Sequence, residues 1–473
     1  MAKNFVLKGI DVIKPHRMIF AILLAYVLSL LFTNISIFLG GQRLQISEVF
    51  FLFLFFLWIK SLIEKKRLPQ GTPLSRSFLL FIAFCLLSFF NSTDLRLSIM
   101  ELAGLIYLFV MLVLVVDVVN NKRKLDLVIK FWIGATLMVL ILGFVGGGVA
   151  ILTGKANLFC RAYYGNYPYI KTAFRVQSIF HNPLVLANFL TVSLGFMFSD
   201  LLLTENQRYK FILKVAISFA TLLMLATISR EILGFIISLF LIYSYFFKKA
   251  SLKYRVIRFL LIVFIIIIFL FIFIFCSSFH IHSFKVEDSW HKTYRSSLIN
   301  INYSFSEKLA YKMAALEMLK RHPFLGVGLK MYRPYIQKLN NEDYFYSHNL
   351  TPIYYYIYEG RYFNYLQVND PHNDFLQYFA ETGLLGGVAF IIFVATFLSL
   401  VHTNLKKRPF NQYFKIRLFC FLASFVGILV HSIDIDVFKY RPVWFLMALT
   451  LALIIMSKDK IDAVNVDRSD EKN

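Results

Sequence analysis

The sequence predicts an all-α polytopic integral membrane protein with about twelve transmembrane helices and one large extramembrane loop. First, mean hydropathy is +0.65, and 58% of the 473 residues are hydrophobic against 16% charged, too apolar for a soluble protein surface. Second, apolar runs near the ~20 residues that cross a bilayer recur along the chain. Third, Lys and Arg cluster between apolar runs, so the net charge of +23 indicates membrane orientation rather than nucleic-acid binding.

The predicted spans follow these apolar runs. In chain order they are 18–39, 46–63, 78–92, 97–119, 126–152, 183–203, 211–228, 231–247, 257–278, 374–401, 416–433 and 441–456. No cleavable signal peptide is expected, because the first run is long enough to span and lacks a small-residue cleavage site. The four cysteines show no spacing typical of a disulfide framework or a metal site.

Basic clusters in alternate connections orient the predicted helices. The clusters are EKKR at 64–67, NNKRK at 120–124, KKASLKYRVIR at 248–258 and KKRPFNQYFKIR at 406–417. Cytoplasmic loops are enriched in Lys and Arg, so both termini are expected in the cytoplasm and the other connections on the outer side. The chain then divides into helices one to nine (1–278), a large outward loop (279–373), helices ten to twelve (374–457) and a polar cytoplasmic tail (458–473).

The large outward loop is predicted to contain an amphipathic helix that lies on the membrane part. SFSE at 304–307 fits a capping box, with Ser304 as N-cap and Glu307 at the third helical position. An apolar stripe at helical spacing follows: Leu309, Met313 and Leu316. Pro323 then ends the helix, and FLGVG at 324–328 turns the chain. Tyrosines are dense beyond this point, which is typical of an aromatic belt at a membrane surface or of rings that stack on sugars.

Polar residues at the start of the tenth span form a first candidate site. Asp370 is suited to be an N-cap and Pro371 the first helical residue, so His372 and Asn373 are expected in the first turn. Free backbone N–H groups and the helix dipole make such an end favourable for anions, phosphate included. From spacing alone, an ordinary cap with an exposed histidine is the simpler explanation.

Two arginines at outward helix ends favour a functional site. Arg230 lies between the seventh and eighth spans with almost no loop around it, where a cation needs an anionic partner or an aqueous cavity. A side chain that snorkels at a tight hairpin is the alternative. Arg175 precedes the Asn-Pro pair expected to cap and open the sixth span. Arg161 and Lys171 share its loop, and a bound polyanion would explain why these outward cations break the positive-inside trend.

Four segments together resemble the O-antigen ligase and O-antigen polymerase superfamily of bacterial inner membranes. They are AFRVQSIFHNPLVLANFL (173–190), ATISREILGF (226–235), KLAYKMAALEMLKRHPFLGVGLKMY (308–332) and NDPHNDFLQYFAETGLLGG (369–387). Their order fits as well, and the resemblance covers roughly residues 160–445. The sequence departs from the family pattern in the loop helix, where Lys308 and Lys312 stand in place of an Arg and a Trp.

The resemblance implies an inner-membrane enzyme that transfers a glycan from undecaprenyl pyrophosphate to an acceptor sugar on the periplasmic side. The acceptor is lipid A–core in a ligase, the first interpretation, and another lipid-linked repeat unit in a polymerase, the alternative. A transporter of lipid-linked oligosaccharide would instead place charges along a path through several spans. The spans hold few charges, and the candidates cluster at one face, which favours an enzyme.

The candidate residues suit this chemistry. Arg175 and Arg230 are assigned to the pyrophosphate, because guanidinium groups contact phosphate in pairs and stabilise charge growing on the leaving group. His372 is assigned to the acceptor hydroxyl, as general base or as positioning group. Asn373 is assigned to orienting the site or capping the helix. Further substrate contacts are expected from Arg161, Lys171, Lys308 and Arg321.

Asp434 and Asp436 form a D-x-D pair on the outward side, and such a pair can hold a divalent cation on a diphosphate. Two caps at a short turn, paired with Lys439 or Arg441, are the alternative. Because the arginines already supply positive charge, neither a metal nor another cofactor is expected. The expected partners are the lipid-linked donor, the acceptor and the membrane, with no nucleic acid.

Overall fold

The computed structural model describes residues 15–33, 36–39, 42–164, 172–246, 303–341, 356–358, 361–363, 370–406 and 411–470. Among these residues the chain is mostly helical, with three two-stranded antiparallel hairpins. Seven of the described helices are long and apolar enough to cross a membrane, and four shorter ones are also apolar. The described part is therefore a polytopic helical membrane protein, as predicted.

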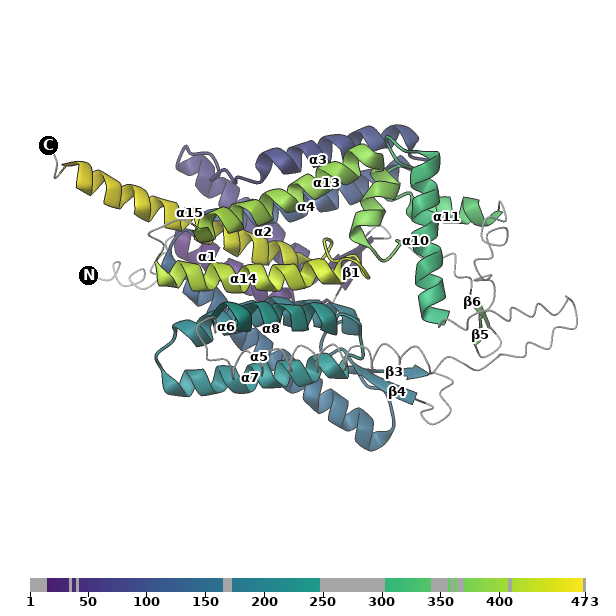
Figure 1. Ribbon diagram of the computed structural model, residues 1–473, viewed down its shortest axis with the longest axis horizontal. Helices are drawn as coiled ribbons and strands as arrows, with labels where there is room; N and C mark the ends of the chain where they lie inside the picture. Colours follow the sequence, from purple (N-terminus) through teal and green to yellow (C-terminus); the bar gives the residue numbers. More distant parts are fainter. Residues whose placement is uncertain are drawn as a thin grey trace, which may run out of the picture.

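The helices form one bundle with a smaller helical part across one end (Figure 1). The long apolar helices are α2 (Ile46–Glu64), α4 (Leu95–Val118), α5 (Lys122–Thr153), α6 (Pro183–Leu203), α7 (Gln207–Ala226), α13 (Asp374–Lys406) and α14 (Gln412–His431). The shorter apolar ones are α1 (Pro15–Ser29), α3 (Ser75–Leu87) with η1 (Ser88–Asn91), α8 (Ile232–Phe246) and the first part of α15 (Arg441–Asp470). Across the end lie α10 (Tyr303–Arg321) and α11 (Tyr332–Asn341).

Three short hairpins accompany the helices: β1 (Ser36–Leu39) with β2 (Gln42–Gln45), β3 (Cys160–Tyr164) with β4 (Thr172–Val176), and β5 (Tyr356–Tyr358) with β6 (Arg361–Phe363). The first hairpin corrects the sequence prediction of a span over 18–39. Helix α1 ends at Ser29, and Ser36–Leu39 at the end of the same run pair with β2. The predicted span at 257–278 lies outside the described residues, so the count of twelve stays a prediction.

Helices α6 and α14 form the centre of the bundle. Helix α6 begins as predicted, with Asn182 as N-cap and Pro183 in the first turn, and its most apolar window is 83% buried. Helix α14 packs against α6 and α8. The side chain of Arg417 in α14 is 3% exposed and donates to Ser199 of α6 at 2.9 Å. It also donates to two carboxylates, Asp126 of α5 at 2.7 Å and Asp200 of α6 at 2.8 Å.

We call the end of the bundle that carries α10, the start of α13, and the α7–α8 and α14–α15 connections the site end. Asn91, after α3, donates to the carbonyl of Gly326 at 2.7 Å. The backbone N–H of Asp374 donates to the carbonyl of Ser432 at 3.0 Å. Helix α15 extends away from the bundle at the opposite end (Figure 1). The described parts of the connections predicted to face outward therefore gather at one end, while their orientation in a membrane stays a prediction.

Glycine turns join α10 to α13. Helix α10 ends before Pro323, as predicted, and Gly326 and Gly328 in the following turn have φ of 66° and 106°. Helix α13 is interrupted at Gly383, with φ 70° and ψ −171°. A Cβ on Gly326 would lie 2.4 Å from the carbonyl carbon of Glu381. Only glycine therefore permits these two backbones to approach so closely.

The interruption of α13 frees backbone groups that the turn then satisfies. The N–H of Val327 donates to the carbonyl of Ala380 at 3.0 Å, and the N–H of Gly328 to that of Glu381 at 2.9 Å. In return, the N–H of Leu384 donates to the carbonyl of Pro323 at 2.7 Å. The turn thus replaces helical hydrogen bonds at the break, and it fixes α10 to the first part of α13.

The buried face of α10 differs from the predicted stripe. It consists of Tyr311, Ala314, Ala315 and Met318, each at most 1% exposed. Leu316 is 45% exposed, so the predicted phase is wrong, and the Leu309 side chain lies outside the described part. The small alanines let α10 approach α13 closely. The predicted stripe left them out because it was built from large apolar residues. The helix begins at Tyr303, so Ser304 lies within the first turn and is not the N-cap.

Candidate functional site

The polar segment before α13 is not the first turn of the helix. Helix α13 begins at Asp374, and its N-cap is Asn373, whose Oδ1 accepts the N–H of Leu376 at 2.9 Å. The Nδ2 of Asn373 donates to the carbonyl of Ile433 at 3.0 Å. The prediction that Asp370 caps the helix is wrong, because the segment before Asp374 is not helical.

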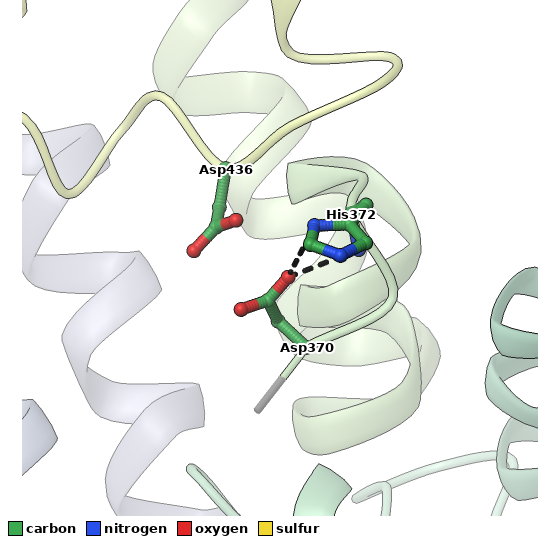
Figure 2. Close-up of side chains that lie close together, drawn as sticks. All are labelled: Asp370, His372 and Asp436. Carbon is green, nitrogen blue, oxygen red and sulfur yellow. Dashed lines mark hydrogen bonds and ion pairs between the residues drawn. The ribbon is translucent and has the colours of Figure 1, made fainter. Parts of the chain in front are cut away.

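His372 has φ of 53°, a left-handed conformation that a right-handed helix excludes. The side chain of Asp370 folds back over it. Oδ1 of Asp370 accepts the backbone N–H of His372 at 3.0 Å and lies 3.2 Å from the ring Nδ1 (Figure 2). This is an Asx turn, which Asp forms readily with the N–H two residues ahead. The Asp-Pro-His order was the sequence signal for it, and the interpretation as a helix cap missed it.

Asp436, from the α14–α15 connection, faces this pair (Figure 2). One oxygen or nitrogen of each of Asp370, His372 and Asp436 lies within 4.8 Å of the others. Behind Asp436, the Nζ of Lys439 is 3.2 Å from its Oδ2 and 3.5 Å from Glu101 of α4. By distance the three side chains can share one cation, but Lys439 already brings positive charge to Asp436. The expectation of no metal stays a prediction.

The protonation of this cluster follows from its partial burial. Burial alone would raise the pKa of Asp436, but attraction to Lys439 and a hydrogen bond with Asp370 lower it to about 2. Burial, and then the Asp436 charge, raise the pKa of Asp370 above its usual range. Asp436 and Lys439 are therefore an ion pair at neutral pH, and Asp370 is the carboxyl that takes up a proton first on acidification.

A second cluster lies beside the first. Asp434, two residues before Asp436, is 3.8 Å through Oδ2 from Arg230 and 3.8 Å through Oδ1 from Lys312 of α10. Tyr311 of α10 has its ring centroid 6.0 Å from that of His372. The α7–α8 connection, α10 and the α14–α15 connection thus converge on one region. In the sequence, Lys312 stands out only as a departure from the family pattern, and nothing there predicts its contact with Asp434.

The remaining candidates are spread more widely. Arg175 donates from Nε to the carbonyl of Thr227 at 2.9 Å, in the same connection as Arg230. Arg161 is exposed and lies opposite Arg175 in the β3–β4 hairpin. Arg321 pairs with Glu317 at 2.8 Å near the far end of α10, roughly 13 Å from Lys312 at 1.5 Å rise per residue. Outside the described part lie Lys171 and the side chain of Lys308.

Tyr332 and Tyr335, which follow the glycine turn, contribute to packing. Tyr332 is fully buried, and its hydroxyl donates to the carbonyl of Tyr311 at 2.8 Å. Tyr335 lies with its hydroxyl 3.2 Å from the ring of His322. Tyr332 is therefore neither part of a surface belt nor a platform for a sugar, while the tyrosines of 342–355 lie outside the described residues.

Buried polar groups of α13 hold the site in place. Asp374 has no exposed surface, and its Oδ2 accepts the backbone N–H of Val437 at 2.7 Å. Glu381, also fully buried, accepts the N–H of Tyr332 at 3.3 Å. The first carboxylate fixes the connection that carries Asp434 and Asp436, and the second fixes the start of α11. Both contacts position the site without facing it.

A family model described as "O-Antigen ligase" matches residues 215–391 of the chain. A search of curated proteins finds no match to this chain. The matched range contains Arg230, Lys312, His372 and both glycine turns, whereas Arg175 precedes it and the α14–α15 connection follows it.

Proposed function

Because residues 215–391 match the O-antigen ligase family model, we propose that this chain is a membrane glycosyltransferase of the ligase type. It moves a glycan from undecaprenyl pyrophosphate to a sugar of lipid A–core at the periplasmic face of the inner membrane. The observation that carries the proposal is the convergence of Arg230, Lys312 and His372 from three separate parts of the chain. A scaffold or a transporter gives no reason for that convergence at one end of the bundle.

Arg230 and Lys312 hold the diphosphate of the donor. Both reach the same point beside Asp434, one from the α7–α8 connection and one from α10. Arg175 supports them from β4 through its contact with the α7–α8 connection. As the bond between the anomeric carbon and the diphosphate breaks, negative charge grows on the leaving oxygen. Cations already in place stabilise that charge without reorganisation, which lowers the barrier.

His372 receives the proton of the acceptor. The acceptor hydroxyl oxygen attacks the anomeric carbon, the carbon–oxygen bond to the diphosphate breaks, and undecaprenyl pyrophosphate leaves with the electron pair. The hydroxyl proton passes to the imidazole, which is a suitable base near neutral pH. The outward orientation of the site end follows from the basic clusters of the opposite connections.

Gel analysis of lipopolysaccharide and of lipid-linked glycan in a deletion strain tests the proposal. Long glycan chains that remain on undecaprenyl pyrophosphate are the expected result for a ligase. Lipid A–core that carries single repeat units would instead identify a polymerase, which joins lipid-linked units by the same chemistry. Unchanged lipopolysaccharide together with unchanged lipid-linked glycan would refute both.

A further inference from the structure

The contact between Asp370 and His372 determines which ring nitrogen carries the proton. Oδ1 of Asp370 accepts the backbone N–H of His372 at 3.0 Å, so this oxygen presents a lone pair and not a proton. The same oxygen lies 3.2 Å from Nδ1 of the ring. A lone pair attracts an N–H and repels another lone pair, so Nδ1 is the protonated nitrogen of the neutral ring. Nε2 is then the nitrogen with a free lone pair.

The surrounding structure holds this pair in place. The α14–α15 connection brings Asp436 against Asp370, with Lys439 behind it (Figure 2 shows the two carboxylates). Glu101 of α4 binds Lys439 at 3.5 Å and, through its other oxygen, Lys330 of the glycine turn at 3.3 Å. The carboxyl beside His372 is therefore connected to the α10–α13 junction by alternating charges, and it has little freedom to turn away.

The titratable groups around His372 come from each neighbouring segment. Asp370 comes from its own segment, Tyr311 from α10, and Asp436 with Lys439 from the α14–α15 connection. Asp436 and Lys439 compensate one another, so Asp370 is the partner whose charge acts most directly on the imidazole.

We propose that Asp370 is the positioning residue of His372: it holds Nδ1–H and thereby leaves Nε2 as the nitrogen that accepts the substrate proton. The role in transfer rests on the proposed function, whereas the tautomer and the ring orientation do not. In the reaction, Nε2 gains the proton that the acceptor hydroxyl loses, and the imidazolium is stabilised through Nδ1–H. The proton returns to solvent after the product leaves. Asp370 keeps its contact with Nδ1 throughout and does not contact the sugar.

Two variants separate the two parts of this role. In Asp370→Asn the amide oxygen can still accept Nδ1–H, but the charge is gone. In Asp370→Ala the acceptor oxygen and the charge are both removed, and the ring is free to adopt the Nε2–H tautomer that free histidine prefers. Asp94→Asn is the matched control, because Asp94 is an exposed N-cap at the site end and Asn caps a helix equally well.

The first readout is the tautomer of His372, measured by ¹⁵N NMR on histidine-labelled protein in lipid, with His372→Asn to assign the signal. Wild type and Asp370→Asn are expected to show Nδ1–H, and Asp370→Ala mainly Nε2–H. This readout does not require glycan transfer, so it stands even where the proposed function fails. Nδ1–H in Asp370→Ala would overturn the proposal.

The second readout is the rate of glycan transfer. Partners that orient metal-bound histidines change activity by about 10- to 100-fold, and on the same scale we expect roughly 10-fold loss in Asp370→Asn and about 100-fold in Asp370→Ala. Asp94→Asn should keep the wild-type rate. An active wild type beside unchanged Asp370 variants would refute the positioning role alone.

A metal measurement separates this role from metal ligation. Purified wild-type protein is incubated with Mn²⁺ or Zn²⁺, washed, and analysed for bound metal, and transfer is assayed with and without a chelator. We expect transfer to survive chelation and metal content to be equal in wild type and Asp370→Asn. Bound metal that is lost in Asp370→Asn, together with chelator-sensitive transfer, would make Asp370 a ligand and overturn the proposal.

Discussion

The backbone at His372 limits which substitutions can test this residue. Its φ of 53° is left-handed, where alanine is strained and asparagine is tolerated far better. The simplest truncation, His372→Ala, therefore combines loss of the imidazole with backbone strain. His372→Asn keeps a polar side chain of similar reach and isolates the chemistry.

We expect His372→Asn to lower glycan transfer by about 10²- to 10⁴-fold, the usual contribution of a general base. Membrane insertion and purified yield should stay at the wild-type level, because Asn373 caps α13 without His372. Transfer assays with donor in excess, alongside quantified protein, test this. Near wild-type transfer by well-expressed His372→Asn protein would reduce His372 to a part of the turn.

Asp434 lies where the donor diphosphate is proposed to bind. Its two oxygens are each 3.8 Å from a cation, Arg230 on one side and Lys312 on the other. Partly exposed pairs of this length contribute under about 1 kcal/mol each, so an incoming dianion can displace them at low cost.

Asp434→Asn should therefore bind inorganic pyrophosphate about 3- to 10-fold more tightly than wild type, since two weak ion pairs no longer compete. Calorimetry on protein in detergent measures this. Arg230→Lys is the opposing comparison and should bind more weakly, because a point ammonium does not reproduce the guanidinium fork. Weaker binding by Asp434→Asn would show that its carboxylate supports the site instead of competing with the anion.

At the scale of elements, sequence reasoning placed α10, the glycine turn and α13 but not the way they fit together. Pro323 and the glycines that follow it mark a turn by themselves, because proline ends a helix and glycine permits positive φ. The break at Gly383 cannot be predicted from the local sequence, since a glycine inside a helical pattern is usually tolerated. The same holds for Ala314 and Ala315, whose burial depends on what packs against them.

Ala substitution at these two glycines should destabilise the junction between α10 and α13. Gly326→Ala and Gly383→Ala each introduce a Cβ within 2.4 Å of backbone atoms at a positive φ. We expect each to lower stability by more than about 1 kcal/mol. Gly104→Ala on α4 is the control, because a Cβ there meets nothing within 4 Å.

Thermal unfolding in detergent compares the three variants. Gly104→Ala should unfold at or slightly above the wild-type temperature, since alanine favours a helix. Equal unfolding temperatures for all three would mean that the close approach of the two turns is not needed for the fold.

At the scale of the whole molecule, hydropathy and charge predicted most of the architecture. Apolar length identified the spans that coincide with the described helices, because the bilayer imposes it on each helix separately. The site is different, since the roles of Lys312 and Asp434 depend on partners distant in sequence. The predicted extent of the first span was wrong for a related reason. An apolar run near a membrane surface can satisfy its backbone hydrogen bonds in a hairpin as well as in a helix.

Reporter fusions test the orientation that the basic clusters predict. Fusions after Ser306 and after Lys460 should report periplasmic and cytoplasmic positions respectively. The two positions belong to α10 and to the far part of α15, at opposite ends of the bundle. Cytoplasmic activity at Ser306, or periplasmic activity at Lys460, would contradict both the orientation and the proposed periplasmic reaction.

The Arg417 cluster gives the two ends of the bundle different responses to ionic strength. Its charged contacts are 2.7 and 2.8 Å long around a side chain that is 3% exposed, and mobile ions screen such contacts poorly. Arg230, at 32% exposed and 3.8 Å from Asp434, is open to screening. Added salt should therefore weaken pyrophosphate binding while the unfolding temperature stays nearly constant. The electrolyte of the surrounding medium then adjusts donor affinity without altering the fold that presents the site.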